Sequence, residues 1–174
     1  MSSSSSEFSR LHDRRKLPAG PVRIEADEAE RAALARRFDL VRIDRLQAVL
    51  ELAGDGDAVS VTGAMQAAWV QSCAVSGDDL PAERADEPVA IRFVPEPATG
   101  TPDEEVELDA SDLDEIFYDG TVIDIGEAVA QTLALAVDPF AAGPEADRVR
   151  EEAGLAELAP EGPLQQALKG LKRD

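Results

Sequence analysis

The chain has 174 residues, 44% of them hydrophobic, which is enough for a globular domain with a core of its own. No apolar run reaches the roughly 18 residues that a membrane-spanning helix needs, and the N-terminal MSSSSSEFSR lacks the apolar stretch of a secretory signal. The single cysteine, Cys73, cannot form an internal disulfide. We therefore expect a cytoplasmic protein that is not bound to a membrane.

The net charge of −19 at pH 7 is distributed unevenly along the chain. Residues 1–23 carry a net charge of +3, whereas the stretch from Phe93 to Asp147 has fifteen Asp and Glu residues and no Lys or Arg. Such an acidic block repels nucleic-acid phosphates and attracts basic proteins over a screening length of about 10 Å. An acidic surface that only keeps the protein soluble is the alternative.

The N-terminal residues 1–19 are rich in Ser and then in basic residues, and we expect them to be disordered. Residues 20–140 are predicted to form a single α+β domain. Its first elements are a short strand in LPAGPVRIEAD and a helix over EAERAALARRF. Asp27 and Glu30 have the spacing of a capping box at the start of that helix.

From Leu40 to Val94 apolar residues recur at every second position, which predicts strands. AGDGD marks a hairpin turn, and the odd-numbered residues of VSVTGAMQAAWVQSCAV form the more apolar face of the next strand. Gly63 within that pattern indicates a bulge or a bend. SGDDLPAERADEP is predicted to be a loop before a strand at Val89–Val94. Three or four consecutive antiparallel strands form a β-meander that can curl towards a barrel.

Residues 96–115 are predicted to form an acidic loop that faces a partner through Asp103, Glu104, Glu105 and Glu107. Beyond the loop, DGTVIDIGEAVAQTLALAV predicts an extended piece and then a helix that Asp124 caps. Residues 141–174 are predicted to be a loose tail that ends in a short amphipathic helix from Pro163. The fold class is thus α+β, with a short N-terminal helix and one or two C-terminal helices.

Few residues of the chain could carry out chemistry. His12, the only histidine, lies far in sequence from Cys73, which disfavours a Cys-His catalytic pair. One Cys and one His are too few for a typical zinc site, and DASDLDEIFYDG departs from the calcium-loop pattern. We therefore expect no enzyme activity, cofactor, metal or small-molecule substrate. Cys73 is predicted to be buried as a small hydrophobic residue on one strand face with Trp69 and Met65.

Five segments occur in the order EAERAALARRFDLVRIDRLQAVLEL, GAMQAAWVQSCAVSGDDLP, IRFVPE, DGTVIDIGEAVAQTLALAVDPF and PLQQALKGLK. In order and spacing they resemble the YceD family, the large ribosomal RNA subunit accumulation proteins, in its alphaproteobacterial form. The family motif positions fall on Gln71, Cys73, Asp124, Gly126, Glu127, Asp138 and Pro139.

Many members of the YceD family carry a second cysteine shortly after the one that matches Cys73, and further cysteines after the proline that matches Pro139. The family has been called metal-binding for this reason. This chain has AVSGDD and FAAGPEADRVREEAG at those places, without a thiol. The resemblance therefore implies that the metal site is absent here and that Cys73 is a former ligand position now held by packing.

The resemblance implies a non-enzymatic role in making or accumulating large-subunit rRNA, and family genes often lie beside one for a small basic ribosomal protein. With the charge pattern, this predicts an acidic face that binds a basic ribosomal protein or a precursor large subunit. Arg14, Arg15 and Lys16 would make the weak contacts with rRNA. The alternative is that these three residues belong to a solvated tail that binds nothing. Two other classes stay open, namely a generic acidic chaperone or inhibitor of a basic partner outside the ribosome, and a thiol enzyme that uses Cys73.

Overall fold

The computed structural model describes residues 6–96 and 114–154. These residues form two compact units, one made of 6–71, 81–96 and 114–138 and the other of 72–80 and 139–154. The predicted single domain over 20–140 is therefore wrong in one respect, because the segment 72–80 belongs to the same unit as the residues that follow 138.

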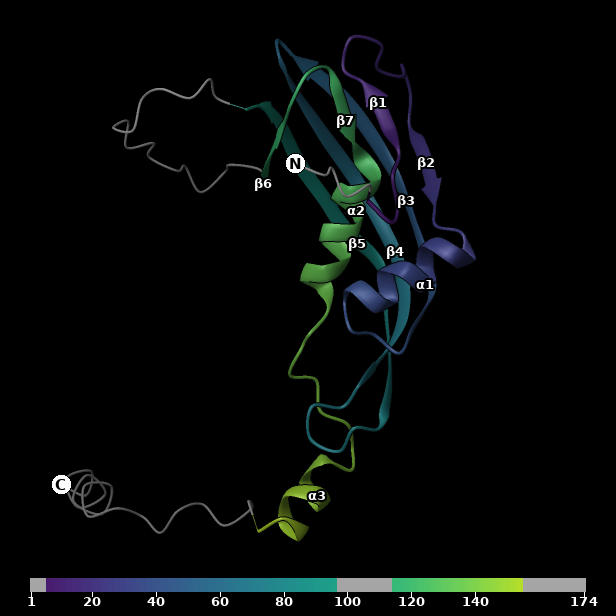
Figure 1. The fold of residues 1–174 in the computed structure, drawn as a ribbon, viewed down its shortest axis with the longest axis vertical. Helices are drawn as coiled ribbons and strands as arrows, with labels where there is room; N and C mark the ends of the chain where they lie inside the picture. The colour runs from purple at the N-terminus through teal and green to yellow at the C-terminus, as the bar shows by residue number, and fades with distance from the viewer. Residues whose placement is uncertain (1–5, 97–113, 155–174) are drawn as a thin grey trace, which may run out of the picture. The chain divides into compact units, whose positions relative to one another are not determined.

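Five strands of the described chain form one sheet in the order β2-β3-β4-β5-β6 (Figure 1). Their bounds are Val22–Glu25, Arg42–Asp55, Ala58–Ser72, Asp79–Pro95 and Asp114–Tyr118. β2, β3 and β4 pair antiparallel in sequence order, while β6 runs parallel to β5. The predicted α+β meander is confirmed, and the sheet does not close into a barrel within the described residues. The parallel strand β6 was not predicted.

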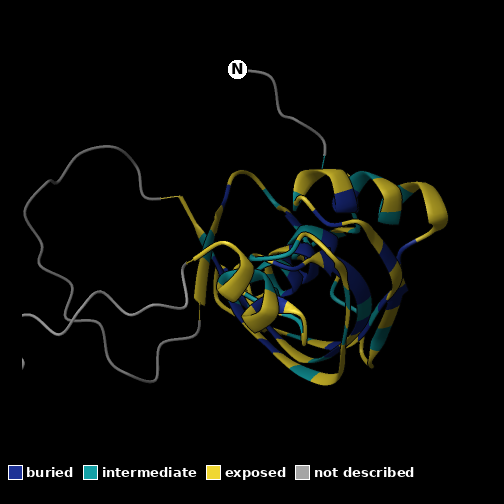
Figure 2. Cartoon of the chain, turned by 90° about the horizontal axis from the view of Figure 1, so that it is seen from below, coloured by how far each residue is buried: buried dark blue, intermediate teal, exposed yellow. Residues whose placement is uncertain are grey.

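The β3–β4 hairpin carries much of the core, because each strand alternates buried and exposed residues as the period of two requires. Trp69 and Met65 are fully buried on β4, and the buried residues line the inside of the curved sheet (Figure 2). At Gly63 the pairing continues without a shift, so of the predicted bulge or bend the bulge is wrong. Glycine is needed for another reason, since a Cβ at this position would lie 2.1 Å from the carbonyl oxygen of Val49.

Strand β5 begins at Asp79, ten residues before the predicted strand. Most of its first half is exposed, so the sequence LPAERADEP lacks the apolar face by which a strand is recognised. This segment is held by its place beside β4 in the sheet. The predicted loop over these residues is therefore wrong.

Two helices of the first unit begin at carboxylates that the sequence indicated. Helix α1, Glu28–Arg37, starts with the predicted capping box of Asp27 and Glu30. Helix α2, Ile125–Ala136, starts at Asp124, whose side chain accepts hydrogen bonds from the first turn. Val129 and Leu133 on α2 are fully buried in the core. Both predicted helices are confirmed.

The second unit contains helix α3, Ala146–Glu152, so the predicted loose tail is wrong for these residues. Three ion pairs within α3 and its N-cap, among them Arg148–Glu145 and Arg148–Glu152, support this short helix. The amphipathic helix predicted from Pro163 lies outside the described residues.

The N-terminal residues 6–13 have a defined place in the fold of the first unit, and the prediction of disorder is wrong for them. Strand β1, Leu11–Asp13, pairs antiparallel with β7, Val122–Asp124, in a two-stranded sheet (Figure 1). The Phe8 side chain has no exposed surface. A serine-rich start does not exclude order when one large aromatic side chain can be buried, because burying it stabilises the fold by about 1.5–3 kcal/mol.

We predict that Phe8→Ala lowers the free energy of unfolding by about 3–5 kcal/mol, because it leaves a cavity in the core. Urea denaturation measures this loss. Phe117→Ala is the matched control, since Phe117 is 59% exposed and its loss costs much less. Equal stability of Phe8→Ala and the parent chain would show that residues 6–10 are not part of the fold.

Candidate functional site

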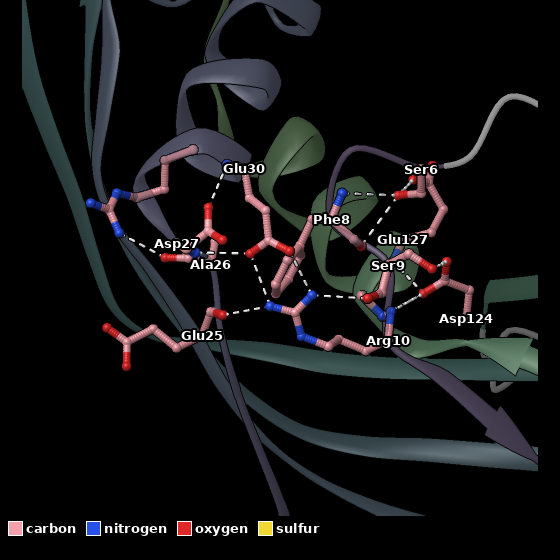
Figure 3. Close-up of polar contacts among 12 residues, drawn as sticks. Ser6, Phe8, Ser9, Arg10, Glu25, Ala26, Asp27, Glu30, Asp124 and Glu127 are labelled. Atoms are coloured by element: carbon pink, nitrogen blue, oxygen red, sulfur yellow. Dashed lines mark hydrogen bonds and ion pairs between the residues drawn. The ribbon is translucent and has the colours of Figure 1, made fainter.

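Asp124 joins three parts of the fold through one carboxylate (Figure 3). It is the last residue of β7 and the N-cap of α2, and it accepts hydrogen bonds from the amides of Gly126 at 3.0 Å and Glu127 at 3.2 Å. The same side chain accepts the amide of Arg10 at 2.7 Å and the hydroxyl of Ser9 at 2.6 Å. One carboxylate thus accepts hydrogen bonds both from the free N–H groups at the start of α2 and from donors of the N-terminal segment.

Gly126 lets the N-terminal segment approach the start of α2. A Cβ at this position would lie 2.3 Å from the carbonyl oxygen of Phe8 and 2.9 Å from the amide nitrogen of Arg10. Any larger residue would push the backbone of the segment away. Glycine at this predicted motif position is therefore explained by close packing of two backbones.

Glu127 links α2 to α1 through a bidentate pair with Arg37, whose Nη2 and Nη1 lie 2.7 Å and 2.9 Å from Oε1 and Oε2. The hydrogen bonds from Arg37 lower the pKa of Glu127 to about 2, although partial burial opposes this. Ser6 also donates its hydroxyl to Glu127 at 2.6 Å. This carboxylate is ionised and fully engaged in holding the helices and the N-terminal segment.

Arg10 makes a second link from the N-terminal segment, to the start of α1. Its guanidinium pairs with both carboxylate oxygens of Glu30, at 2.6 Å and 2.9 Å, and donates to the carbonyl of Glu25. The hydrogen bond from Arg10 holds the pKa of Glu30 below its usual value. The same guanidinium lies 4.6 Å from the ring centre of Phe8. The guanidinium of Arg10 therefore has a structural role, because it holds the N-terminal segment to the start of α1.

Gln71 is buried and bridges β4 to the segment after α2. Its side-chain oxygen accepts the indole N–H of Trp69 at 2.9 Å, and its amide donates to the carbonyl oxygen of Asp138 at 2.5 Å. Pro139 follows and is exposed. The motif residues in the first unit thus satisfy buried polar groups and define where chain segments meet.

Cys73 belongs to the second unit and lies just beyond the end of β4. It is 3% exposed, which confirms the predicted burial, but it does not lie on the strand face of Trp69. Its Sγ accepts the amides of Val75 at 3.4 Å, Ser76 at 3.3 Å and Gly143 at 3.3 Å. The N–H of Gly143 most of all, then the Ser76 side chain and the N–H groups of Ser76 and Val75, lower the pKa of Cys73 to about 6. No pattern in the sequence predicts this loop, whose amides stabilise the thiolate.

The basic residues proposed for RNA contact are mostly neutralised within the chain. Arg14 pairs with Asp57 at 2.8 Å, and Arg15 pairs with Asp13 at 2.7 Å. Lys16 is exposed and has no ion pair in the described part of the chain. The acidic positions Asp103, Glu104, Glu105 and Glu107 lie outside the described residues.

Two surface grooves in the first unit were not predicted. One of about 480 Å³ lies between α1 and the start of β3, and three arginines line it together with Glu28 and Asp44. The other, of about 500 Å³, lies between β6, β7 and the start of α2. We call the second one the β6–β7 groove. Its lining residues are Phe93, Ile116, Phe117, Tyr118, Asp119, Val122, Ile123, Asp124 and Glu127.

No protein-family model, curated protein or solved structure matches this chain. The resemblance to the YceD family therefore stays a prediction from the sequence motifs. Within residues 6–96 and 114–154, no group of three or more His, Cys, Asp or Glu side chains could hold a metal ion. In the same ranges no helix has the length and apolar character to cross a bilayer.

We predict that the Cys73 thiol ionises near pH 6 in the folded chain and near its ordinary pKa of roughly 8.5 after unfolding. Because the folded pKa is the lower one, the stability that the thiolate adds is complete above the unfolded pKa and is lost as the pH falls through the folded pKa. Ultraviolet titration of the thiolate checks the midpoint, with Cys73→Ser as the blank. A native midpoint at or above the unfolded value would contradict the hydrogen-bonded loop.

Proposed function

We propose that the protein is a non-enzymatic ribosome biogenesis factor of the cytoplasm. It binds a basic large-subunit ribosomal protein, or a precursor particle that contains one, through its acidic surface. The observation that carries this proposal is the charge distribution, in which fifteen carboxylates and no Lys or Arg occur from Phe93 to Asp147. The resemblance to the YceD family supplies the ribosomal partner.

The ion pairs of the structure strengthen the charge argument. Ten arginines of the described chain pair with the chain's own carboxylates, which leaves few free cations for phosphate groups. In contrast, exposed carboxylates such as Asp114 and Asp119 have no ion pair within the described residues. The surface is therefore better suited to a cationic protein than to RNA.

The roles of the motif residues fit a binding protein. Asp124, Glu127 and Gln71 have their hydrogen-bonding groups directed at other parts of the fold. These residues have structural roles, and in this proposal the protein surface that they stabilise binds the partner. Direct rRNA contact is a minor contribution in this proposal, because Arg14 and Arg15 are already paired.

A chaperone or inhibitor of a basic protein outside the ribosome is the second candidate, since the same charge distribution would serve it. The two candidates differ in where the protein is found in growing cells. Cosedimentation of the tagged full chain with precursor large subunits supports the ribosomal role, and its absence from those fractions favours the second candidate.

We predict that the purified full chain binds a small basic large-subunit ribosomal protein and that raising the salt from about 0.05 M to about 0.5 M weakens binding at least tenfold. Isothermal calorimetry at the two salt concentrations measures this. Neutralising the predicted acidic loop with Asp103→Asn, Glu104→Gln, Glu105→Gln and Glu107→Gln should also weaken binding.

The matched control neutralises four exposed carboxylates elsewhere, with Glu25→Gln, Glu51→Gln, Asp55→Asn and Asp86→Asn. This control variant should bind more tightly than the loop variant at low salt, because the loop charges are the denser group. If the full chain does not bind the basic protein but binds large-subunit rRNA at high salt, the proposed function is wrong.

A further inference from the structure

Strands β6 and β7 follow each other in the chain but do not pair with each other. Only residues 119–121 separate them, a length typical of a hairpin turn. Within the described residues β6 has β5 as its only strand neighbour, and β7 has only β1. Each strand therefore has one edge whose backbone N–H and C=O groups have no strand partner in the described structure.

The β6–β7 groove lies between these two strands. Residues of β6 and of β7 both line it, and the buried side chains of Phe93 and Ile123 are part of its wall. Phe117 is 59% exposed and Val122 is 44% exposed in the same groove. Backbone edges next to exposed apolar side chains are the features that bind an added strand.

We propose that an extended segment of a basic, partly apolar protein binds in the β6–β7 groove as an additional strand on β6. This inference rests on the proposed function and specifies how the basic partner is held. The five-residue length of β6 suits a partner segment of similar length. Backbone hydrogen bonds would supply affinity, and alternate side chains of the segment would contact Phe117 and Val122.

The charges at the groove favour a cationic segment. Lys and Arg are absent from its lining, and Asp114 and Asp119 lie at the first residue of β6 and directly after its last. Both are exposed and have no ion pair in the described ranges. Asp124 and Glu127 also line the groove but already accept several hydrogen bonds each. Basic side chains at the two ends of the segment would therefore meet Asp114 and Asp119.

The test uses the full chain and a fluorescent peptide of alternating Val and Lys, about eight residues long. We expect fluorescence anisotropy to show binding, and peptides with Glu in place of Lys or Ser in place of Val to bind much more weakly. Hydrogen exchange of the β6 amides should slow when the Val-Lys peptide is added, because an added strand bonds to that edge.

Phe117→Lys should weaken peptide binding at least about tenfold, because it removes an apolar contact and adds a repelling charge. Leu135→Lys is the matched control, since Leu135 is 79% exposed on α2 and does not line the groove. It makes the same change in net charge and should alter binding much less. Phe117→Thr, which suits a strand, serves as a second variant if Phe117→Lys does not fold.

The outcomes separate this inference from the proposed function. A basic ribosomal protein that binds equally well to Phe117→Lys and to Leu135→Lys would overturn the groove but leave the acidic surface as the binding site. No binding of any basic protein would overturn both. Leu168 and Leu171 are apolar residues of the C-terminal helix that the sequence predicts from Pro163. Peptide binding that appears only when both are changed to Ser would show that the chain's own C-terminal segment is the occupant, which contradicts a partner strand.

Discussion

The fold of the first unit depends on the carboxylate of Asp124. In one position it caps α2 and holds the backbone of Arg10 and the hydroxyl of Ser9. The residues next to this contact complete the arrangement, because Gly126 gives the N-terminal segment room and Phe8 enters the core. The N-terminal segment is therefore ordered by two contacts on neighbouring residues, namely the hydrogen bonds to Asp124 and the burial of Phe8.

The parts of the fold that the sequence predicted are those set by local rules. The capping box of Asp27 and Glu30 and the alternation along β3 and β4 depend on residues a few positions apart, so their patterns are visible in the chain itself. Burial of Cys73 was also predictable from its type. The hydrogen bond that its sulfur accepts from the amide of Gly143 was not, because Gly143 comes from a segment seventy residues away.

The errors arose where long-range contacts decide the structure. Residues 6–10 have no hydrophobic period, and their order comes from Asp124, more than a hundred residues further along the chain. The first half of β5 has no buried face, and β6 joins the sheet in parallel after the long segment 96–113. Nothing within five residues of Phe117 indicates that it lies at an unpaired strand edge. The groove therefore could not be predicted from the sequence.

The motif residues and the proposed binding surface have different tasks. Carboxylates with arginine or amide partners, such as Glu127 and Glu30, hold segments together. Carboxylates that have no ion pair within residues 6–96 and 114–154, such as Asp114 and Asp119, give the surface its charge. Asp119 of the second group lines the β6–β7 groove together with Asp124 and Glu127 of the first group. Asp124 also anchors the first turn of α2. Asp124, which anchors the N-terminal segment, is therefore also one of the residues that line the proposed binding site.

The measurement that tests the central role of Asp124 most directly is native-state hydrogen exchange of Asp124→Ala, with Asp119→Ala as the control. We predict that the amides of β1 and of the first turn of α2 lose protection together, while those of the β3–β4 hairpin keep it. Loss of protection in the first turn of α2 alone, with β1 unchanged, would contradict the role of Asp124 as the anchor of the N-terminal segment.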